Sequence, residues 1–294
     1  MKCTRGGLIL RVACLVGWLG MALVAITAQA QTFAYVANAH SNSVSVIDTA
    51  SNKVVGTVAV GAYPWGLAIT PDGSRVYVAD TDSNSVSVID TRRKKLIGTV
   101  AVGDNPIGVA ITPDGSRAYV TNPFSNSVSV IDTASNTVTA TVSAENPYGA
   151  AITPNGFRAY VPDNNDNLVS VIDTGSNTVT ATFRVGDNPI GVAITPDGTR
   201  AYVTNAFGFS LSVIDTASNT VTATIAVGSI PFWLAITPDG TRAYVANGAD
   251  GTALIRRAAA RIRQDDLIRG SPSQPIAKRA GDLSEQQFFF EKAH

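Results

Sequence analysis

A repeat of about 42 residues constrains this chain more than any other feature of its sequence. The clearest marker is a tyrosine followed by valine, and successive tyrosines of this kind lie 41 or 42 residues apart. These residues are Tyr35, Tyr77, Tyr119, Tyr160, Tyr202 and Tyr244. A fixed period of this size indicates stacked structural repeats, in which each unit packs against its neighbours.

Each repeat contains four short runs rich in valine, isoleucine, threonine and tyrosine, and none is long enough for a helix. In the third repeat these runs cover residues 117–121, 127–131, 137–142 and 148–152. Apolar residues alternate with small polar ones along the second run, which is the period of a half-buried strand. The segment Pro113-Asp114-Gly115 predicts a tight turn, because proline fixes φ, aspartate bonds to nearby backbone and glycine accepts a positive φ.

Four antiparallel strands in every repeat, without a helix between them, indicate one blade of a β-propeller per repeat. We therefore predict an all-β fold, a propeller of four-stranded antiparallel blades. The run before Ile-Thr-Pro marks the innermost strand and occurs five times, ending at Ile69, Ile111, Ile152, Ile194 and Ile236. This predicts about five blade equivalents, either as a ring closed by pairing the N-terminal strands with residues 231–236 or as an incomplete seven-bladed type.

The repeated motifs resemble those of a known family. Tyr-Val-Thr-Asn occurs at residues 119–122 and 202–205, and Tyr-Val-Ala-Asn occurs at residues 35–38 and 244–247. Ser-Val-Ser-Val-Ile-Asp-Thr and Ile-Thr-Pro-Asp-Gly recur in register with them. With these motifs, residues 32–247 resemble the YVTN β-propeller repeat. The resemblance implies exported proteins of mostly uncharacterised function, usually with about seven blades.

The first 30 residues have the pattern of a secretory signal peptide. Lys2, Arg5 and Arg11 precede an apolar run over residues 12–26, and Ala28-Gln29-Ala30 fits a cleavage site with small residues. We expect cleavage before Gln31, a secreted, periplasmic or cell-surface location, and no membrane span in the mature chain. The alternative is a membrane anchor, for which the apolar run is short.

Cysteine and charge content exclude several classes of site. Cys3 and Cys14 both lie in the predicted signal peptide, so the mature chain has no disulfide and no thiolate metal site. The formal net charge is zero and the sequence contains no basic stripe, so we expect no nucleic-acid partner.

The composition changes abruptly after Asn247, which we take as the end of a propeller domain that begins at residue 31. The repeat pattern predicts Val-Ser-Val-Ile-Asp soon after this point, but the chain continues with alanine and arginine residues and then Ser271-Pro272-Ser273-Gln274-Pro275. Residues 248–294 are therefore predicted to form a tail outside the propeller. The tail is either an amphipathic helix with a disordered segment or the product of a disrupted reading frame.

The mouth of the central channel is the predicted ligand site, because two sets of loops meet there in a propeller. The loops before the innermost strands keep a constant proline while the next residue varies between aromatic and aliphatic, and variation on a fixed scaffold indicates specificity. The candidate ligand-binding residues are Trp65, Asp104, Asn105, Glu145, Tyr148, Asp187, Asn188, Phe232 and Trp233. We expect a protein, peptide or carbohydrate ligand. In the alternative, the aromatic residues only plug the channel.

Catalytic groups are sparse in the repeats, where His40 is the single histidine and Glu145 the single glutamate. We therefore predict no catalytic residue, no cofactor and no metal. Residues 163–167 are rich in oxygen ligands, but they lack the glycine and distal glutamate of a calcium loop and fit a solvated turn better. An arginine after each Pro-Asp-Gly or Pro-Asn-Gly turn fits an anion-binding ring or, preferably, a structural brace. These residues are Arg75, Arg117, Arg158, Arg200 and Arg242.

These features favour an exported, non-catalytic β-propeller that acts as a binding or interaction scaffold through its channel-mouth loops. One alternative is an enzyme, either a lactonase-like hydrolase or a quinoprotein-type dehydrogenase domain, which predicts a bound metal or cofactor. The other alternative is a structural cell-surface or envelope protein. A propeller short of blades has open strand edges, which favour self-association.

Overall fold

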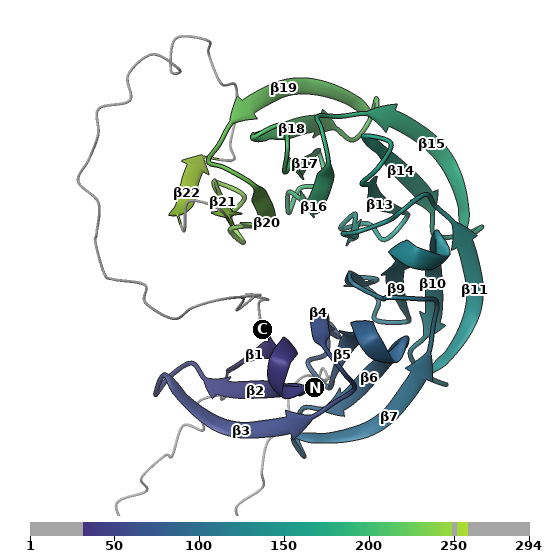
Figure 1. Cartoon of the computed structure of the whole chain (residues 1–294), viewed down its shortest axis with the longest axis vertical. Helices are drawn as coiled ribbons and strands as arrows, with labels where there is room; N and C mark the ends of the chain where they lie inside the picture. Colours follow the sequence, from purple (N-terminus) through teal and green to yellow (C-terminus); the bar gives the residue numbers. More distant parts are fainter. Residues whose placement is uncertain (1–31, 249–251, 258–294) are drawn as a thin grey trace, which may run out of the picture. The chain divides into compact units, whose positions relative to one another are not determined.

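The computed structural model describes residues 32–248 and 252–257, with side chains described for the first of these ranges. This part of the chain is almost entirely β, with six antiparallel sheets that follow one another in sequence order (Figure 1). We number these sheets as blades 1 to 6. The predicted all-β propeller of antiparallel blades is confirmed.

Each blade is a meander in which consecutive strands pair. Blade 1 consists of β1 (Phe33–Asn38), β2 (Ser43–Asp48) and β3 (Lys53–Ala59). Blade 2 consists of β4 (Pro64–Ile69), β5 (Arg75–Asp80), β6 (Ser85–Asp90) and β7 (Lys95–Ala101). Blade 3 consists of β8 (Val109–Ile111), β9 (Arg117–Asn122), β10 (Ser127–Asp132) and β11 (Thr137–Ser143).

The remaining blades repeat this order. Blade 4 consists of β12 (Ala151–Ile152), β13 (Arg158–Asp163), β14 (Leu168–Asp173) and β15 (Thr178–Arg184). Blade 5 consists of β16 (Pro189–Ile194), β17 (Arg200–Asn205), β18 (Ser210–Asp215) and β19 (Thr220–Ala226). Blade 6 consists of β20 (Pro231–Ile236), β21 (Arg242–Asn247) and β22 (Thr252–Arg257). Three short 3₁₀ turns, η1 (Ala39–Ser41), η2 (Thr81–Ser83) and η3 (Pro123–Ser125), follow β1, β5 and β9.

The hydrophobic core lies between neighbouring blades, because the middle strands are buried on both faces. Tyr77, Val86 and Val88 of blade 2 pack with Ala118 and Val120 of blade 3. These five side chains are completely buried. Since every blade is nearly the same sequence, the same packing recurs from one interface to the next.

The recurring tyrosine joins each blade to the next by a hydrogen bond as well. Tyr77 Oη donates to Asn136 Oδ1 at 2.7 Å, and the acceptor lies in the turn between the two outer strands of blade 3. The equivalent bonds join Tyr119 to Asn177 at 2.7 Å and Tyr160 to Asn219 at 2.6 Å. The tyrosine position is therefore a structural link between blades.

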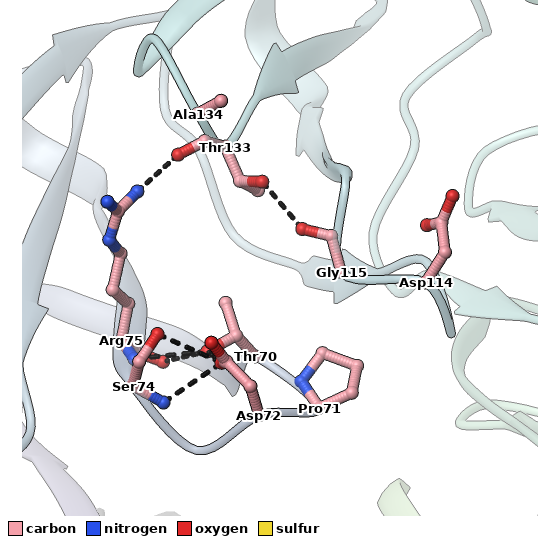
Figure 2. A pocket seen from close by; sticks show the side chains of 9 residues that line it. All are labelled: Thr70, Pro71, Asp72, Ser74, Arg75, Asp114, Gly115, Thr133 and Ala134. Atoms are coloured by element: carbon pink, nitrogen blue, oxygen red, sulfur yellow. Dashed lines mark hydrogen bonds between the residues drawn. The ribbon is translucent and has the colours of Figure 1, made fainter.

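The recurring arginine makes a parallel link. Arg158 Nη1 donates to the carbonyl of Thr216 in the next blade at 2.8 Å. Arg75 and Arg117 donate in the same way to the carbonyls of Thr133 and Thr174, the first of which is drawn in Figure 2. At these three positions the arginine braces neighbouring blades, the role preferred from the sequence.

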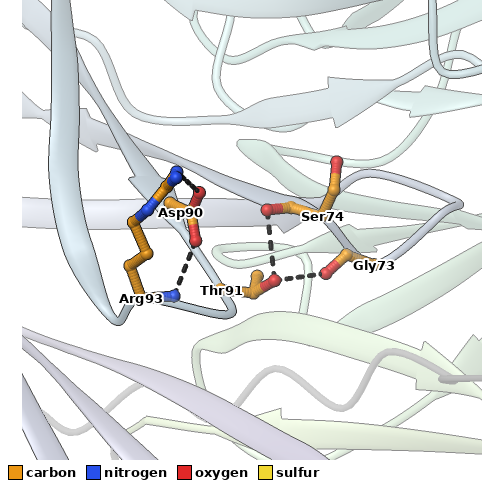
Figure 3. Close-up of polar contacts among 5 residues, drawn as sticks. All are labelled: Gly73, Ser74, Asp90, Thr91 and Arg93. Atoms are coloured by element: carbon orange, nitrogen blue, oxygen red, sulfur yellow. Dashed lines mark hydrogen bonds and ion pairs between the residues drawn. The ribbon is translucent and has the colours of Figure 1, made fainter.

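Within each of blades 2 to 5, a threonine connects the two turns at the end opposite the 3₁₀ turns. Thr91 Oγ1 donates to the carbonyls of Gly73 and Ser74, at 2.6 and 3.1 Å, while Arg93 forms an ion pair with Asp90 at 3.0 Å (Figure 3). Thr133 bonds to Gly115 at 2.5 Å in the same way. The Pro-Asp-Gly turn is thus tied to the turn after the third strand.

The two terminal blades differ from the five-bladed ring considered from the sequence. That ring required residues 231–236 to pair with the N-terminal strands, but β20 pairs with β21 of its own blade. The reason is that Arg242–Asn247 is a complete second strand and occupies this edge. The last strand, β22, lies beyond Asn247, the end predicted for the propeller; the rest of the predicted tail and the predicted signal peptide lie outside the described residues.

Candidate functional site

The two sets of loops at the predicted channel mouth are joined by hydrogen bonds from blade to blade. Asparagine ends the loop between the second and third strands in a left-handed conformation, with φ of 50° at Asn42 and 51° at Asn84. The Oδ1 of this asparagine accepts a hydrogen bond from a backbone N–H in the proline loop of the next blade. Tyr63 N–H donates to Asn42 Oδ1 at 3.0 Å, and Asn105 N–H donates to Asn84 Oδ1 at 2.9 Å. Asparagine suits this position because it tolerates αL and offers an acceptor.

The predicted polar site residues take part in this framework. Asp104 accepts a hydrogen bond from Asn84 Nδ2 at 3.1 Å, and Asp187 accepts one from Asn167 Nδ2 at 3.4 Å. Asn188 is half-buried and donates to Asn164 Oδ1 at 2.8 Å. Asp104 and Asp187 nevertheless stay exposed, so their remaining carboxylate oxygens face solvent beside the loops.

Three aromatic rings gather at the junction of blades 1 and 2. Tyr63 and Trp65 stack with ring centroids 5.8 Å apart and planes 17° from parallel. His40 lies 5.8 Å from Tyr63 on the other side, tilted by 60°. Of the predicted aromatic residues, Trp65 is therefore part of a half-exposed cluster with His40 and Tyr63, two residues that were not predicted as ligand contacts.

Trp233 belongs to a different group, because it replaces a glycine. Gly66, Gly108, Gly149 and Gly191 follow the variable residue in blades 2 to 5, and blade 6 has Trp233 at this position. The indole lies about 3.4 Å from where a Cβ on Gly149 would be. Trp233 of blade 6 thus lies against the segment before the inner strand of blade 4.

The other predicted residues are spread over the same loops. Phe232 packs beside Gly248, its ring 2.9 Å from where a Cβ would be. Glu145 is exposed. Tyr148 is half-buried, and its carbonyl accepts a hydrogen bond from Thr121 Oγ1. The nine predicted residues therefore do not form one compact pocket, but line several adjacent loops.

The predicted site residues do not include an exposed variable position in the loops between the second and third strands, the second set of loops at the predicted channel mouth. It is occupied by His40, Asp82, Phe124, Asn165 and Phe207 in blades 1 to 5, and all five are exposed. Phe124 is 74% exposed and Phe207 is 66% exposed, while Phe209 two residues later is 51% exposed. This position could have been found from the sequence, because all five residues follow the recurring tyrosine at the same distance along the chain.

We call the surface formed by residues 39–42, 81–84, 123–126, 164–167 and 206–209 the loop face. Two buried carboxyl groups, those of Asp80 and Asp163, lie next to these residues in the chain. Burial raises the pKa of Asp80 to about 6, although Ser87 Oγ donates a hydrogen bond to it at 2.7 Å. Burial also raises the pKa of Asp163 to about 7, with smaller contributions from the charges of Asp166 and Glu145. The other repeats have asparagine here.

The acidic segment 163–167 turns its first side chains into the protein. Asp163 Oδ2 accepts a hydrogen bond from Ser170 Oγ at 2.7 Å, and Asn164 Nδ2 donates to the carbonyl of Pro189 at 3.1 Å. Across residues 32–248, no three His, Cys, Asp or Glu side chains are grouped as a metal site would require. The geometry of these two residues therefore serves blade packing.

A cavity of about 280 Å³ lies at the opposite end of blades 2 and 3, near the Pro-Asp-Gly turns (Figure 2). Its polar groups bond to one another, since Asp72 accepts from Thr70 Oγ1 at 2.6 Å and from the backbone N–H of Ser74 at 3.0 Å. The same cavity is crossed by the Arg75–Thr133 link. It is therefore part of the blade framework and a weaker candidate than the loop face.

Comparison with known proteins supports the fold. Residues 62–89 match the NHL repeat. The structure is similar to Kuenenia stuttgartiensis hydrazine synthase, with a TM-score of 0.57 and 23% identity over 76% of this chain and 92% of that chain. It is also similar to a functionally unknown protein from Desulfotomaculum acetoxidans, with a TM-score of 0.66 and 22% identity over 76% of this chain and 78% of that one. No curated protein matches the chain.

The repeat, the sheet topology and the structural neighbours together define the class of this protein as a repeat β-propeller. The matched repeat is of the NHL type and does not single out the YVTN family. At this level of identity the structural neighbours bear on the fold alone. Among the helices of the described residues, none is long and apolar enough to cross a membrane.

Proposed function

We propose that this protein is an exported, non-catalytic propeller scaffold of the YVTN type that binds a protein or peptide through its loop face. The observation that carries the proposal is the exposed variable position shared by His40, Asp82, Phe124, Asn165 and Phe207. The residues around this position are held in a constant hydrogen-bonded frame, such as the bond from Asp104 N–H to Ser125 Oγ at 2.7 Å. A rigid frame with variable exposed tips is typical of recognition surfaces.

The exposed aromatic residues favour a protein or peptide over a small ligand. Phe124 lies in one loop, and Phe207 and Phe209 lie two residues apart in another. Aromatic residues are enriched at interfaces with macromolecules. The cluster of His40, Tyr63 and Trp65 adds a second apolar contact. A carbohydrate remains the competing ligand, because sugar rings also stack on aromatic side chains.

A combined peptide and glycan array tests this proposal on purified protein. We expect peptide binding that is reduced about ten-fold or more by the double substitution Phe124→Ala and Phe207→Ala. Phe157→Ala is the matched control, because Phe157 is 68% exposed but follows the Asn155-Gly156 turn at the opposite end of the blade. Equal loss in the control, or binding of glycans alone, would contradict a peptide-binding loop face.

The enzymatic alternatives are separated by a different readout. A lactonase-like hydrolase or a quinoprotein-type dehydrogenase would carry a metal or a coloured cofactor. Elemental analysis and the absorbance spectrum of the exported protein therefore test both. A stoichiometric metal or a cofactor band, together with turnover that Asp104→Asn or Glu145→Gln abolishes, would overturn the scaffold proposal.

A further inference from the structure

The first blade has a strand edge that is covered in every other blade. In blades 2 to 6, the strand with the recurring tyrosine lies between an inner strand and a third strand. The equivalent strand of blade 1 is β1, and within the described ranges it pairs with β2 alone. The other edge of β1 therefore presents the backbone groups that its equivalents use for pairing.

Two positions of β1 are more exposed than their equivalents in the other blades. Ala34 is half-buried, whereas its equivalents are at most 1% exposed: Val76, Ala118, Ala159, Ala201 and Ala243. These equivalents pack against the preceding blade, and no described blade precedes blade 1. Asn38 is also half-buried, whereas its equivalents are at most 5% exposed: Asp80, Asn122, Asp163, Asn205 and Asn247. The middle of β1 remains buried by the neighbouring blade, as Tyr35 is 3% exposed.

The loop before the inner strand explains the exposure of Asn38. In blade 5, Gly186 of that loop lies so close to Asn205 that an added Cβ would be 2.6 Å from its side chain. In blade 2, Gly61 covers Asp80 in the same way. Among the described residues, blade 1 therefore lacks both the inner strand and the Val-Gly-x-x-Pro loop that precedes it in other blades.

The other blades define which sequence fits this edge. In blade 5, Val192 lies opposite Val203, Ala193 opposite Tyr202 and Ile194 opposite Ala201. Blades 2 and 6 use the same register with leucine in place of Val192. Blade 1 has valine, tyrosine and alanine at the matching positions 36, 35 and 34. An incoming Val-Ala-Ile segment would therefore pair with β1 in the register that β16 adopts against β17.

We propose that the edge of β1 that pairs with no described strand binds an extended segment of another polypeptide with the pattern Pro-x-Gly-(Leu/Val)-Ala-Ile, by addition of a strand to blade 1. Backbone hydrogen bonds along β1 supply affinity, and the small and apolar side chains of the incoming segment supply specificity. The glycine is part of the pattern because inner strands of adjacent blades touch there, as Gly66 N–H donates to the carbonyl of Ile107 at 3.0 Å. This edge is separate from the loop face and does not rest on the function proposed above.

A labelled peptide with the sequence of residues 185–196 tests the proposal by fluorescence polarisation on the full chain. We expect saturable binding, no binding of a scrambled peptide, and an affinity lowered about ten-fold or more by Ala34→Glu, which places a charge under the incoming strand. Val54→Glu is the matched control, because Val54 is 60% exposed on β3 at the far side of the same sheet. Absence of saturable binding, or equal binding of the scrambled peptide, overturns the proposal.

A disulfide trapping experiment tests the register and does not depend on the glutamate variant being folded. The protein variant carries Ala34→Cys, and its own cysteines are removed by Cys3→Ser and Cys14→Ser. This variant is mixed with the peptide that has cysteine in place of Ile194. Directly opposite residues of an antiparallel pair are close enough to form a disulfide. The peptide with cysteine in place of Ala193 points to the other face of the strand and is expected to react at least about ten-fold more slowly.

Light scattering tests whether a second copy of the chain occupies the edge of β1. A monomer that is trapped selectively by the Ile194-substituted peptide supports the proposal. A dimer that excludes the peptide until it dissociates would assign this edge to a second copy of the chain and overturn the proposed partner. Equal trapping of both cysteine peptides would contradict the proposed register.

Discussion

At the scale of single residues, the Tyr–Asn link shows how one position controls the contact between blades. Tyr77, Tyr119 and Tyr160 each bond to an asparagine of the next blade. At the first interface the asparagine is replaced by Lys94, which has no acceptor, and the buried Tyr35 Oη has no hydrogen-bond partner. Lys94 instead places its Nζ 4.4 Å from the centroid of the Phe33 ring.

Lys94→Asn is therefore expected to stabilise the protein. The asparagine supplies the missing acceptor to Tyr35 and tolerates the φ of 52° at this position better than lysine does. It also removes the contact with Phe33, so we expect a net gain of about 1 kcal/mol in the free energy of unfolding. Urea unfolding measures the gain. Asn136→Lys is the reverse control and should destabilise; a loss of stability in Lys94→Asn would contradict this explanation.

The buried carboxyl groups of Asp80 and Asp163 give a prediction about pH. For each, the pKa in the folded state lies above the ordinary value of 3.8, at about 6 and about 7. The folded state therefore binds more protons than the unfolded state between pH 3.8 and these values. Stability from these groups is complete below the unfolded pKa and is lost as the pH rises through the folded one.

Replacing both groups by asparagine should remove this dependence. Asn122 and Asn205 already occupy the equivalent positions and donate to serines, for example from Asn205 Nδ2 to Ser212 Oγ at 3.0 Å. We expect the double variant Asp80→Asn, Asp163→Asn to be more stable than the wild type at pH 8, by on the order of 2 kcal/mol, and similar to it at pH 3.5. Thermal unfolding at the two pH values measures this. If stability changes equally between the two pH values in the wild type and the double variant, the two carboxyl groups are not the cause of the pH dependence.

At the scale of strands and loops, local signals predicted most elements and inter-blade contacts decided the rest. The runs predicted at 117–121, 127–131 and 137–142 match β9, β10 and β11 within one residue, because alternation and turn residues are visible in the sequence. The run predicted at 148–152 is a regular strand only over Ala151–Ile152. Tyr148 N–H donates to the carbonyl of Pro162 in its own sheet at 3.1 Å, whereas Gly149 N–H donates to the carbonyl of Ile190 in blade 5 at 3.0 Å.

The candidate site was predictable to the same extent. The proline loops were found from the sequence, since they recur with a constant frame. Their partners were not, because the bonds from Asn84 to Asp104 and from Asn188 to Asn164 join residues of different loops. Phe124 was not among the predicted residues, because the prediction took the residue after the proline as the variable position.

Close approach of the inner strands predicts a position-specific effect of glycine substitution. A Cβ on Gly66 would lie 2.1 Å from the carbonyl oxygen of Ile107 and 3.2 Å from its carbon, so Gly66→Ala must separate two blades. We expect a loss of about 2–3 kcal/mol in the free energy of unfolding. Gly98→Ala on β7 is the control, because no atom lies within 4 Å of its Cβ position. Urea unfolding that ranks the two variants the other way would contradict this packing.

At the scale of the whole molecule, near-identical blades provide a constant framework that carries variable loop tips. The constant tyrosine and arginine join neighbouring blades, and the constant threonine ties two turns within a blade. The residues that vary from blade to blade on the loop face are exposed, as His40, Asp82 and Phe124 are. The molecule thus separates the groups that hold the fold from those available to a partner.

The proposed export makes a prediction about the N-terminus of the mature protein. Because residues 1–30 have the pattern of a signal peptide, protein collected outside the cytoplasm should begin at Gln31. N-terminal sequencing of this material measures the cleavage site. Substituting Ala30 by a bulky residue such as arginine should block cleavage. An exported protein that retains Met1 would contradict a cleaved signal and favour an anchor.

The central claim is that the loop face binds a polypeptide, and hydrogen–deuterium exchange tests it most directly. The protein is compared alone and with the tightest peptide from the array. We predict protection at residues 39–42, 81–84, 123–126, 164–167 and 206–209, with unchanged exchange at the Pro-Asp-Gly turns such as 71–74 and 113–116. Protection of those turns with unchanged loops would contradict the account.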